Sequence, residues 1–197
     1  SAQAPTAAAS GMINGDVISV TVIGAQTNAG DYTATASLTG DKASSYQLPD
    51  AHTQEFSITK VPLTITANNN AITYGNAPAG NGVTCEGFVN SETASVLGGT
   101  LDYDYSYTQY GDVGNTYTIT PKGLTSVNYE ITFAAGTLTV NAKEVSLSWG
   151  ETTFEYDGSP HAPTATAIGL VNSDVVTVTV TGAQINVGNY TATASAL

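Results

Sequence analysis

The strongest constraint on the fold of this chain is an internal repeat. Residues 1–39 align without gaps to residues 159–197, and 24 of those 39 positions are identical. The segment 24–37 recurs with few changes as the segment 182–195. Because each sequence repeat of this kind is one structural unit that recurs along the chain, the repeat limits the fold to a small module used more than once.

A weaker match lies between these two copies and shows that the offset of 158 residues covers two units. Residues 87–92 match residues 169–174 at an offset of 82, and Phe56-Ser57-Ile58-Thr59 falls on Leu138-Thr139-Val140-Asn141. The middle copy is more diverged, so two subtypes alternate. The sequence therefore predicts the C-terminal part of one repeat in 1–60, a complete repeat in 61–142 and the N-terminal part of a third repeat in 143–197.

Within a repeat, apolar side chains recur at every second position, which is typical of half-buried strands. Valines alternate with threonines in 174–181, and residues 18–22 reproduce this pattern. The loop 24–30 has glycine at both ends and leads into the alternating stretch 31–38, so it predicts a tight hairpin. Further short strands are expected at 61–66, 71–74, 100–107, 117–121, 129–133, 137–141, 144–149 and 153–156.

The strand pattern predicts an all-β fold with at most one short helical turn per repeat. The helical turn is expected at Ser91–Leu97, capped by Asn90 or Ser91, with Glu92 in its first turn. Short, evenly spaced strands without alternating helices favour tandem small β-sandwich-like (Ig-like) modules in an elongated array. β-grasp-like modules are the alternative.

The charge of the chain excludes several classes of partner. Only 10% of the residues are charged, Arg is absent and the formal net charge is −12, so the surface repels nucleic-acid phosphates and anionic lipids. No apolar run approaches the roughly 20 residues that span a bilayer, so membrane insertion is not expected. The single cysteine, Cys85, has no internal partner for a disulfide, and each module must be held by packing.

Several stretches resemble the bacterial repeat family known as MBG, for "mostly beta, glycine rich". The stretch 149–163, which contains Tyr156-Asp157-Gly158, is similar to the opening of its YDG type, and 182–194 is similar to the hairpin of that type. The stretch 72–78, which contains Tyr74-Gly75, is similar to the YGX type, as is 128–140. The resemblance implies that a complete YGX-type repeat is flanked by parts of two YDG-type repeats.

The resemblance also implies a setting. MBG repeats form very large secreted or cell-wall proteins of bacteria, many of them regarded as adhesins, and they carry no catalytic residues. We therefore expect a stalk or spacer outside the cell, at the bacterial surface or secreted, whose partners are the neighbouring repeats of the same chain. The alternative is an adhesin module that itself binds glycans or proteins of a host or cell surface.

Residues capable of catalysis are few, and the expected protein is not an enzyme. A hydrolytic triad needs a histidine, and the chain has only His52 and His161. His161 aligns with Gln3 in the first copy, although a catalytic base should recur in matching repeats. Cys85 aligns with Ala167, so a small residue on a buried strand is expected there, and not a reactive thiol.

No metal ion or cofactor is expected either. Asp102 and Asp104 share one face of a strand, and Glu151, Glu155 and Asp157 cluster near a turn. Ca²⁺ needs six to eight converging oxygen ligands, and no recognised calcium loop is present. A solvated acidic face is the simpler interpretation.

The remaining candidate site is a row of tyrosines. Tyr103, Tyr105 and Tyr107 lie on one strand face with Leu101, and exposed aromatic rings in such a row are a means of binding sugars. The competing interpretation is that the row packs into the core with its hydroxyl groups at the rim. The sequence names these three tyrosines as the possible glycan contacts.

The two incomplete repeats are complementary. Residues 143–158 supply opening strands that have no counterpart in 1–60, and residues 40–60 supply closing strands that have no counterpart in 143–197. Because unpaired strand edges recruit strands from other chains, we expect strand or module complementation between molecules through these truncated ends. A shifted boundary that lets each part close its own smaller fold is the alternative.

Overall fold

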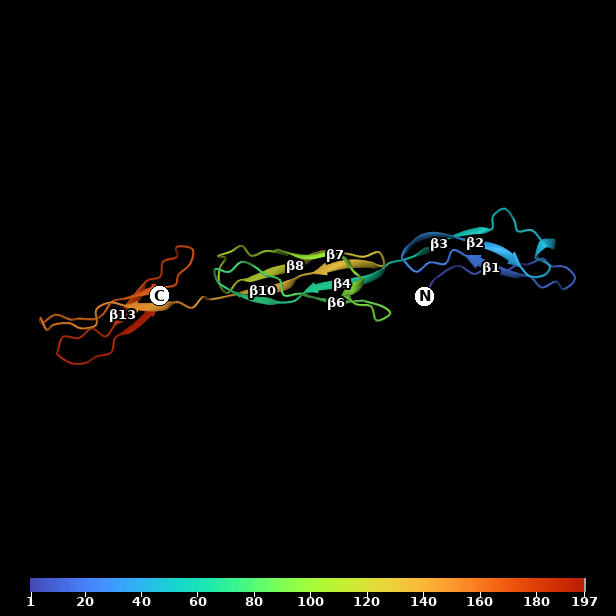
Figure 1. Cartoon of the computed structure of the whole chain (residues 1–197). Helices are drawn as coiled ribbons and strands as arrows, with labels where there is room; N and C mark the ends of the chain where they lie inside the picture. The colour runs from blue at the N-terminus through green and yellow to red at the C-terminus, as the bar shows by residue number, and fades with distance from the viewer. Residues whose placement is uncertain (197) are drawn as a thin grey trace. The chain divides into compact units, whose positions relative to one another are not determined.

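The structure is a computed structural model that describes residues 1–196 (Figure 1). We call residues 1–60, 61–142 and 143–196 the first, middle and third modules. In the first module, three antiparallel strands form one sheet in the order β1-β2-β3. The elements are β1 (Ser19–Ile23), β2 (Gly30–Thr39), the 3-10 turn η1 (Ala43–Ser45) and β3 (Thr53–Ile58).

The middle module has two sheets, with the strand orders β6-β4-β9 and β5-β10-β8-β7. Each sheet contains one parallel pair, β4 with β9 in the first sheet and β5 with β10 in the second. Along the chain, β5 follows β4 and β10 follows β9 within a few residues. The elements are β4 (Val61–Ala67), β5 (Asn70–Thr73), β6 (Val83–Glu86), the 3-10 turn η2 (Ala94–Val96), β7 (Gly98–Tyr105), β8 (Thr116–Thr125), β9 (Tyr129–Ala134) and β10 (Gly136–Asn141).

The third module consists of two separate antiparallel hairpin-like pairs, β11 with β12 and β13 with β14. These pairs correspond to β4 with β6 in the middle module and to β1 with β2 in the first module. The elements are β11 (Ser146–Trp149), β12 (Ala165–Ile168), β13 (Val178–Thr181) and β14 (Thr193–Ala196).

The repeated hairpin loop has the same backbone in both copies. Gly24 has φ +102° and Gly182 has φ +100°, values that side chains rarely tolerate. A Cβ atom at Gly24 would lie 2.7 Å from the Thr33 carbonyl oxygen, and one at Gly182 would lie 2.8 Å from that of Thr191. Glycine is therefore required at the start of this loop, which explains why it recurs.

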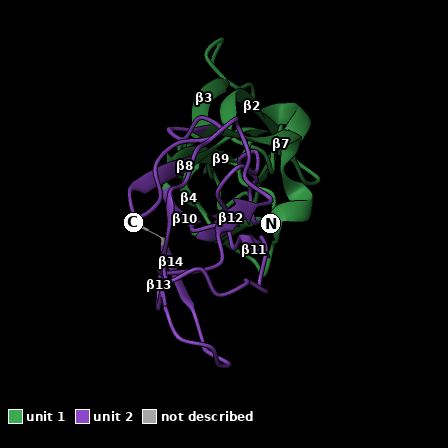
Figure 2. Ribbon diagram, turned by 90° about the vertical axis from the view of Figure 1, so that its left-hand side faces the viewer, with its two compact units in different colours: residues 1–67, 82–104, 120–135 green, residues 68–81, 105–119, 136–197 purple. Residues whose placement is uncertain are grey.

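The described chain divides into two compact units (Figure 2). The first comprises residues 1–67, 82–104 and 120–135, and the second comprises 68–81, 105–119 and the chain from residue 136 onward. The core of the first unit is built on Leu63, Ile65 and Tyr129, with partly buried apolar side chains around them. In the second unit the buried side chains include Tyr107, Ile119, Leu138 and Val140.

The structure confirms an all-β fold built of several small sheets, with one 3-10 turn in the first module and one in the middle module. The expected helical turn is present, but its cap was predicted wrongly. The Thr93 side chain accepts the Ser95 N–H, while Asn90 and Ser91 have positive φ angles of 54° and 60° in the preceding tight turn. No helix among residues 1–196 has the length and apolar character to cross a membrane.

One predicted strand is wrong. Residues 153–156 form no strand, although three of their four counterparts in the middle module, residues 71–73, lie in β5. β5 is held by its parallel pairing with β10. Residues 143–196 include no counterpart of β10, so the segment has no partner for backbone hydrogen bonds and its alternating pattern alone does not make it a strand.

Candidate functional site

The tyrosine row lies mostly inward. Leu101, Tyr103 and Tyr105 are half-buried, and Tyr107, just past the end of β7, is only 3% exposed. The Tyr107 hydroxyl donates to the Asn76 carbonyl oxygen (3.3 Å), and its ring meets Tyr117 edge-on at 5.0 Å. The ring of Tyr107 therefore contributes to packing, and its hydroxyl group is occupied by the backbone.

The opposite face of β7 carries Asp102 and Asp104, and both carboxylates face one lysine. The Lys122 ammonium group contacts Asp104 directly and lies 3.6 Å from Asp102 Oδ2. The hydrogen bond to Asp104 raises the pKa of Lys122 above its ordinary value. The face is exposed and partly neutralised, as expected for a solvated acidic face.

The two histidines and the cysteine each make their own local contacts. His161 Nε2 lies 2.8 Å from Asp157 Oδ1, and its ring stacks on Phe154. His52 Nδ1 lies 3.1 Å from the Asp50 carbonyl oxygen. Cys85 packs against the core of Leu63, Ile65 and Tyr129, and burial raises the pKa of its thiol.

Acidic groups do not converge into a metal site in the described part of the chain. Among residues 1–196, no three side chains of His, Cys, Asp or Glu lie close enough to hold one ion together. Asp157 in the third module is engaged locally, since it accepts the Ser159 N–H at 2.8 Å. This backbone hydrogen bond, together with the one to His161, lowers the pKa of Asp157.

A recurring contact that sequence reasoning missed joins a tyrosine to a tight turn. In the first module the Tyr46 hydroxyl accepts the Ile13 N–H (3.1 Å) and donates to Asp16 Oδ2 (2.8 Å). In the middle module the Tyr129 hydroxyl accepts the Val89 N–H (3.1 Å) and donates to Glu92 Oε2 (2.6 Å).

The signal for this contact was visible in the sequence. All three modules contain the same four-residue pattern: an apolar residue, then Asn, then Ser or Gly, then an acidic residue. The pattern lies at 13–16, 89–92 and 171–174. The Asn is left-handed each time, with φ between 53° and 54°. In the third copy the tyrosine is Tyr74 of the middle module, which directly follows β5. Its side-chain hydrogen bond with Asp174 raises the pKa of Tyr74.

A second missed contact joins the first and middle modules within the first compact unit. Asn128 Oδ1 accepts the Ala29 N–H at 2.8 Å, and Asn128 Nδ2 donates to Asn28 Oδ1 at 3.1 Å. The Tyr32 hydroxyl donates to the Asn28 carbonyl oxygen (3.0 Å) and holds the loop from the other side. Lys60 Nζ, at the link between the modules, donates to the Ser126 carbonyl oxygen.

Comparison with known proteins identifies the middle module. Residues 63–139 match the family model of the MBG domain (YGX type). The match confirms the resemblance to MBG repeats, and the YDG type of the two flanking modules remains a prediction. No curated protein and no solved structure matches the chain.

Proposed function

We propose that this chain is a structural spacer in the extracellular region of a bacterial surface protein, where its modules hold a binding domain away from the cell. The family supports a repeat region of a surface protein. The observation that carries the proposal is the Asn128 contact, because one side chain makes two hydrogen bonds to the hairpin loop of the preceding module.

A spacer must resist bending at its joints, and the first joint has three features that do so. Asn128 fixes the loop 28–29, Lys60 ties the link to Ser126, and Pro62 restricts φ just after the link. A second joint is supported by a close approach in the second compact unit, where a Cβ atom at Gly75 would lie 3.0 Å from Val171 Cγ2. Successive modules that contact only their neighbours suit a long array.

The test measures the distance between spin labels on cysteines at Ser37 and Thr100, in a chain in which Cys85 is replaced by the Ala of the third copy. We expect one narrow distance distribution. Asn128→Ala should broaden it, because the loop then loses both hydrogen bonds, and Asn115→Ala, at an exposed position of the same module, should leave it unchanged.

A distribution that is broad from the start, or one that Asn128→Ala leaves narrow, would contradict the spacer proposal. Small-angle scattering from several whole repeats gives an independent measurement. It should show an extended particle, and a compact globule would also contradict the proposal.

The alternative function, a module that binds glycans, has less support. Tyr107 is buried, and Tyr103 and Tyr105 are half-buried, so the row offers little ring surface for stacking on a sugar. We expect no specific signal on a glycan array. A signal that Tyr105→Ala abolishes would replace the spacer proposal with an adhesin function.

A further inference from the structure

Directly after β5, the middle module has a tight turn at Tyr74-Gly75 that is held on two sides. The Tyr74 N–H donates to the Asn141 carbonyl oxygen at 2.8 Å. Gly75 has φ +92°, a value that side chains rarely adopt, and its carbonyl oxygen accepts Gln109 Nε2 at 2.7 Å. The turn is therefore fixed both to the strand edge and to the loop between β7 and β8.

That loop supports Tyr74 through a residue in an unfavourable conformation. Tyr110 has φ +71°, which is rare for a large side chain. Its N–H donates to the Tyr107 hydroxyl at 3.1 Å, and its ring meets the Tyr74 ring edge-on at 6.2 Å. Backbone strain of this kind persists where the surrounding contacts fix it, and it is concentrated at binding sites. Here the strained residue braces one side of Tyr74.

The turn at 171–174 of the third module has left-handed residues at its centre. The Asp174 N–H donates to the Val171 carbonyl oxygen at 2.9 Å. Asn172 and Ser173 lie between them with φ 53° and 56°. Two successive positive φ angles and this hydrogen bond define a turn of type I′, so the acidic residue and the apolar residue are held close together.

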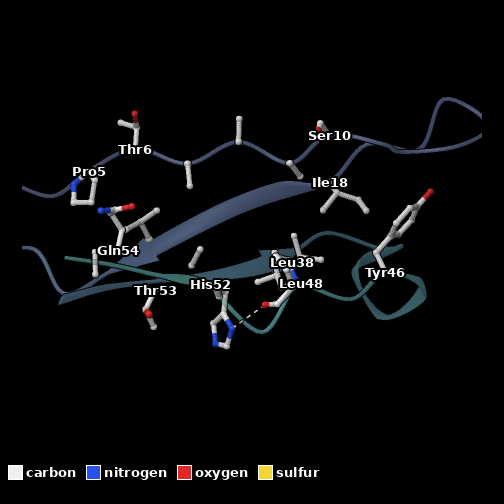
Figure 3. A pocket seen from close by; sticks show the side chains of 18 of the residues that line it. Pro5, Thr6, Ser10, Ile18, Leu38, Tyr46, Leu48, His52, Thr53 and Gln54 are labelled. Atoms are coloured by element: carbon white, nitrogen blue, oxygen red, sulfur yellow. Dashed lines mark hydrogen bonds between the residues drawn. The ribbon is translucent and has the colours of Figure 1, made fainter. Parts of the chain in front are cut away.

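The matching turns of the other two modules bind a tyrosine hydroxyl group. The turn at 13–16 closes through a backbone hydrogen bond of 3.0 Å, and so does the turn at 89–92. Tyr46, which directly follows η1 (Figure 3), reaches the first turn, and Tyr129 reaches the second. In each case the hydroxyl group donates to the acidic residue of the turn. The same turn thus serves twice as a receptor for a tyrosine hydroxyl group.

The turn of the middle module and the turn of the third module meet within the second compact unit. A Cβ atom at Gly75 would lie 3.0 Å from Val171 Cγ2, so the backbone of the glycine packs directly on this valine. The half-buried Tyr74 makes side-chain hydrogen bonds with Asp174 and with Asn172. The first of these raises the pKa of Tyr74 and the second lowers it. The contact combines close apolar packing with a specific polar pairing.

The third module does not repeat the Gly75 end. Asp157 stands at the counterpart position, directly after Tyr156. An aspartate in place of Gly75 would put a Cβ atom against Val171 and bring a second carboxylate to the turn that already carries Asp174. Both the overlap and the like charges oppose contact. The contact therefore distinguishes between the two kinds of module end.

We propose that the Tyr74-Gly75 turn is a docking surface for the acidic left-handed turn of the module that follows, and that it selects which module end can make this joint. The inference rests on the spacer function and names the partner that holds the second joint. Tyr110 is a positioning residue, because it acts through Tyr74. A module with glycine after this tyrosine makes the contact, and a module with aspartate there does not.

The distance between spin labels on cysteines at Thr139 and Thr179 tests the contact in the whole chain, with Cys85 replaced by Ala. Both positions are exposed, one in the middle module and one in the third. We expect one narrow distance distribution. Tyr74→Phe should broaden it, and so should Asp174→Ala, which leaves the middle module unaltered. The double variant should be no broader than either single variant, because the two groups are partners.

A second pair of variants tests the selection of the module end. Gly75→Asp should broaden the distribution, because it gives the middle module the residue that the third module has. Tyr156→Phe is the matched control for Tyr74→Phe, since Tyr156 is the counterpart tyrosine and is 67% exposed. It should leave the distribution unchanged.

The positioning role of Tyr110 has its own test. Tyr110→Gly suits a φ of +71° better than tyrosine does, so the melting temperature should not fall, yet the distribution should broaden because Tyr74 loses its brace. Tyr110→Phe keeps the ring and should restore the narrow distribution. A distribution that stays narrow in Tyr110→Gly would remove this role.

Four results would overturn the docking surface or its selectivity. The distribution could be broad in the unaltered chain, it could stay narrow in Tyr74→Phe and Asp174→Ala, or the double variant could be broader than either. A narrow distribution in Gly75→Asp would remove the selectivity. The labels at Ser37 and Thr100 report the first joint, so a failure of the spacer proposal is recognised separately from a failure at Tyr74.

Discussion

The middle and third modules begin with the same alternating strand, but the two strands have different surroundings. In β4, Leu63 and Ile65 are 1% and 0% exposed, whereas Leu147 and Trp149 of β11 are 41% and 42% exposed. β4 has hydrogen-bonded neighbours on both edges, and β11 has one neighbour among the described residues. The period of two thus determines which side chains share a face, while the later strands of the repeat determine whether that face is buried.

The largest expected effect is a difference between β4 and β11 in how much an alanine substitution lowers the free energy of unfolding. Ile65→Ala should reduce the free energy of unfolding by about 2 to 5 kcal/mol, because it removes a fully buried side chain and leaves a cavity. Leu147→Ala in dilute solution should cost less than about 1 kcal/mol, since much of that side chain already faces solvent. Denaturant titration of the two variants measures both values, and equal losses would show that the third module is as closed as the middle one.

A smaller effect is expected from the tyrosine that closes the turn at 89–92. The hydrogen bond to Glu92 raises the pKa of Tyr129 above its ordinary value of 10.0. The unfolded chain therefore releases this proton at lower pH than the folded chain. The stability contributed by the neutral hydroxyl group is complete below about pH 10 and is lost as the pH rises through the folded pKa.

The variant Tyr129→Phe tests this contribution. It should lower the melting temperature at pH 7, because the Val89 N–H and the Glu92 carboxylate lose a shared partner, and it should flatten the loss of stability above about pH 10. Tyr156→Phe, at a tyrosine that is 67% exposed, is the control and should leave both the melting temperature and the alkaline slope unchanged. An alkaline slope that Tyr129→Phe does not alter would contradict the role of this hydrogen bond.

Much of the fold could be predicted because it depends on local patterns. The strands of the hairpin β1-β2, and also β4, β9 and β10, were predicted from three patterns. These are the repeat, the period of two and the glycine-flanked loops. The strand predicted at 153–156 failed because its pairing depends on β10-like residues that 143–196 do not contain. Cys85 was expected on a strand, but β6 and β12 were given no bounds, because four residues, such as Val83–Glu86, give too short an alternation to delimit.

The contacts that matter for function were harder to predict. Asn28 and Asn128 are 100 residues apart, and neither belongs to a chemical motif. Only the fold brings the two together. The turn at 89–92 did carry a signal, but Asn90 and Ser91 also resemble helix caps, and helix N-caps and left-handed turns favour overlapping residue types. The three copies of the turn, compared with one another, would have favoured the tight turn.

The smallest expected effect is that of Ca²⁺ on the melting temperature, through the carboxylates of the middle module and of the third module. Asp102 and Asp104 of the middle module face Lys122, and Asp157 of the third module accepts hydrogen bonds from Ser159 and His161. An ion that bound the folded chain and not the unfolded chain would raise the melting temperature, and would raise it further at higher ion concentration. Because these carboxylates are already engaged and no third acid joins either group closely, we expect neither Ca²⁺ nor a chelator to shift the melting temperature. A clear rise with Ca²⁺ that Asp104→Asn removes would place a metal site in the middle module, and a rise that only Asp157→Asn removes would place it in the third.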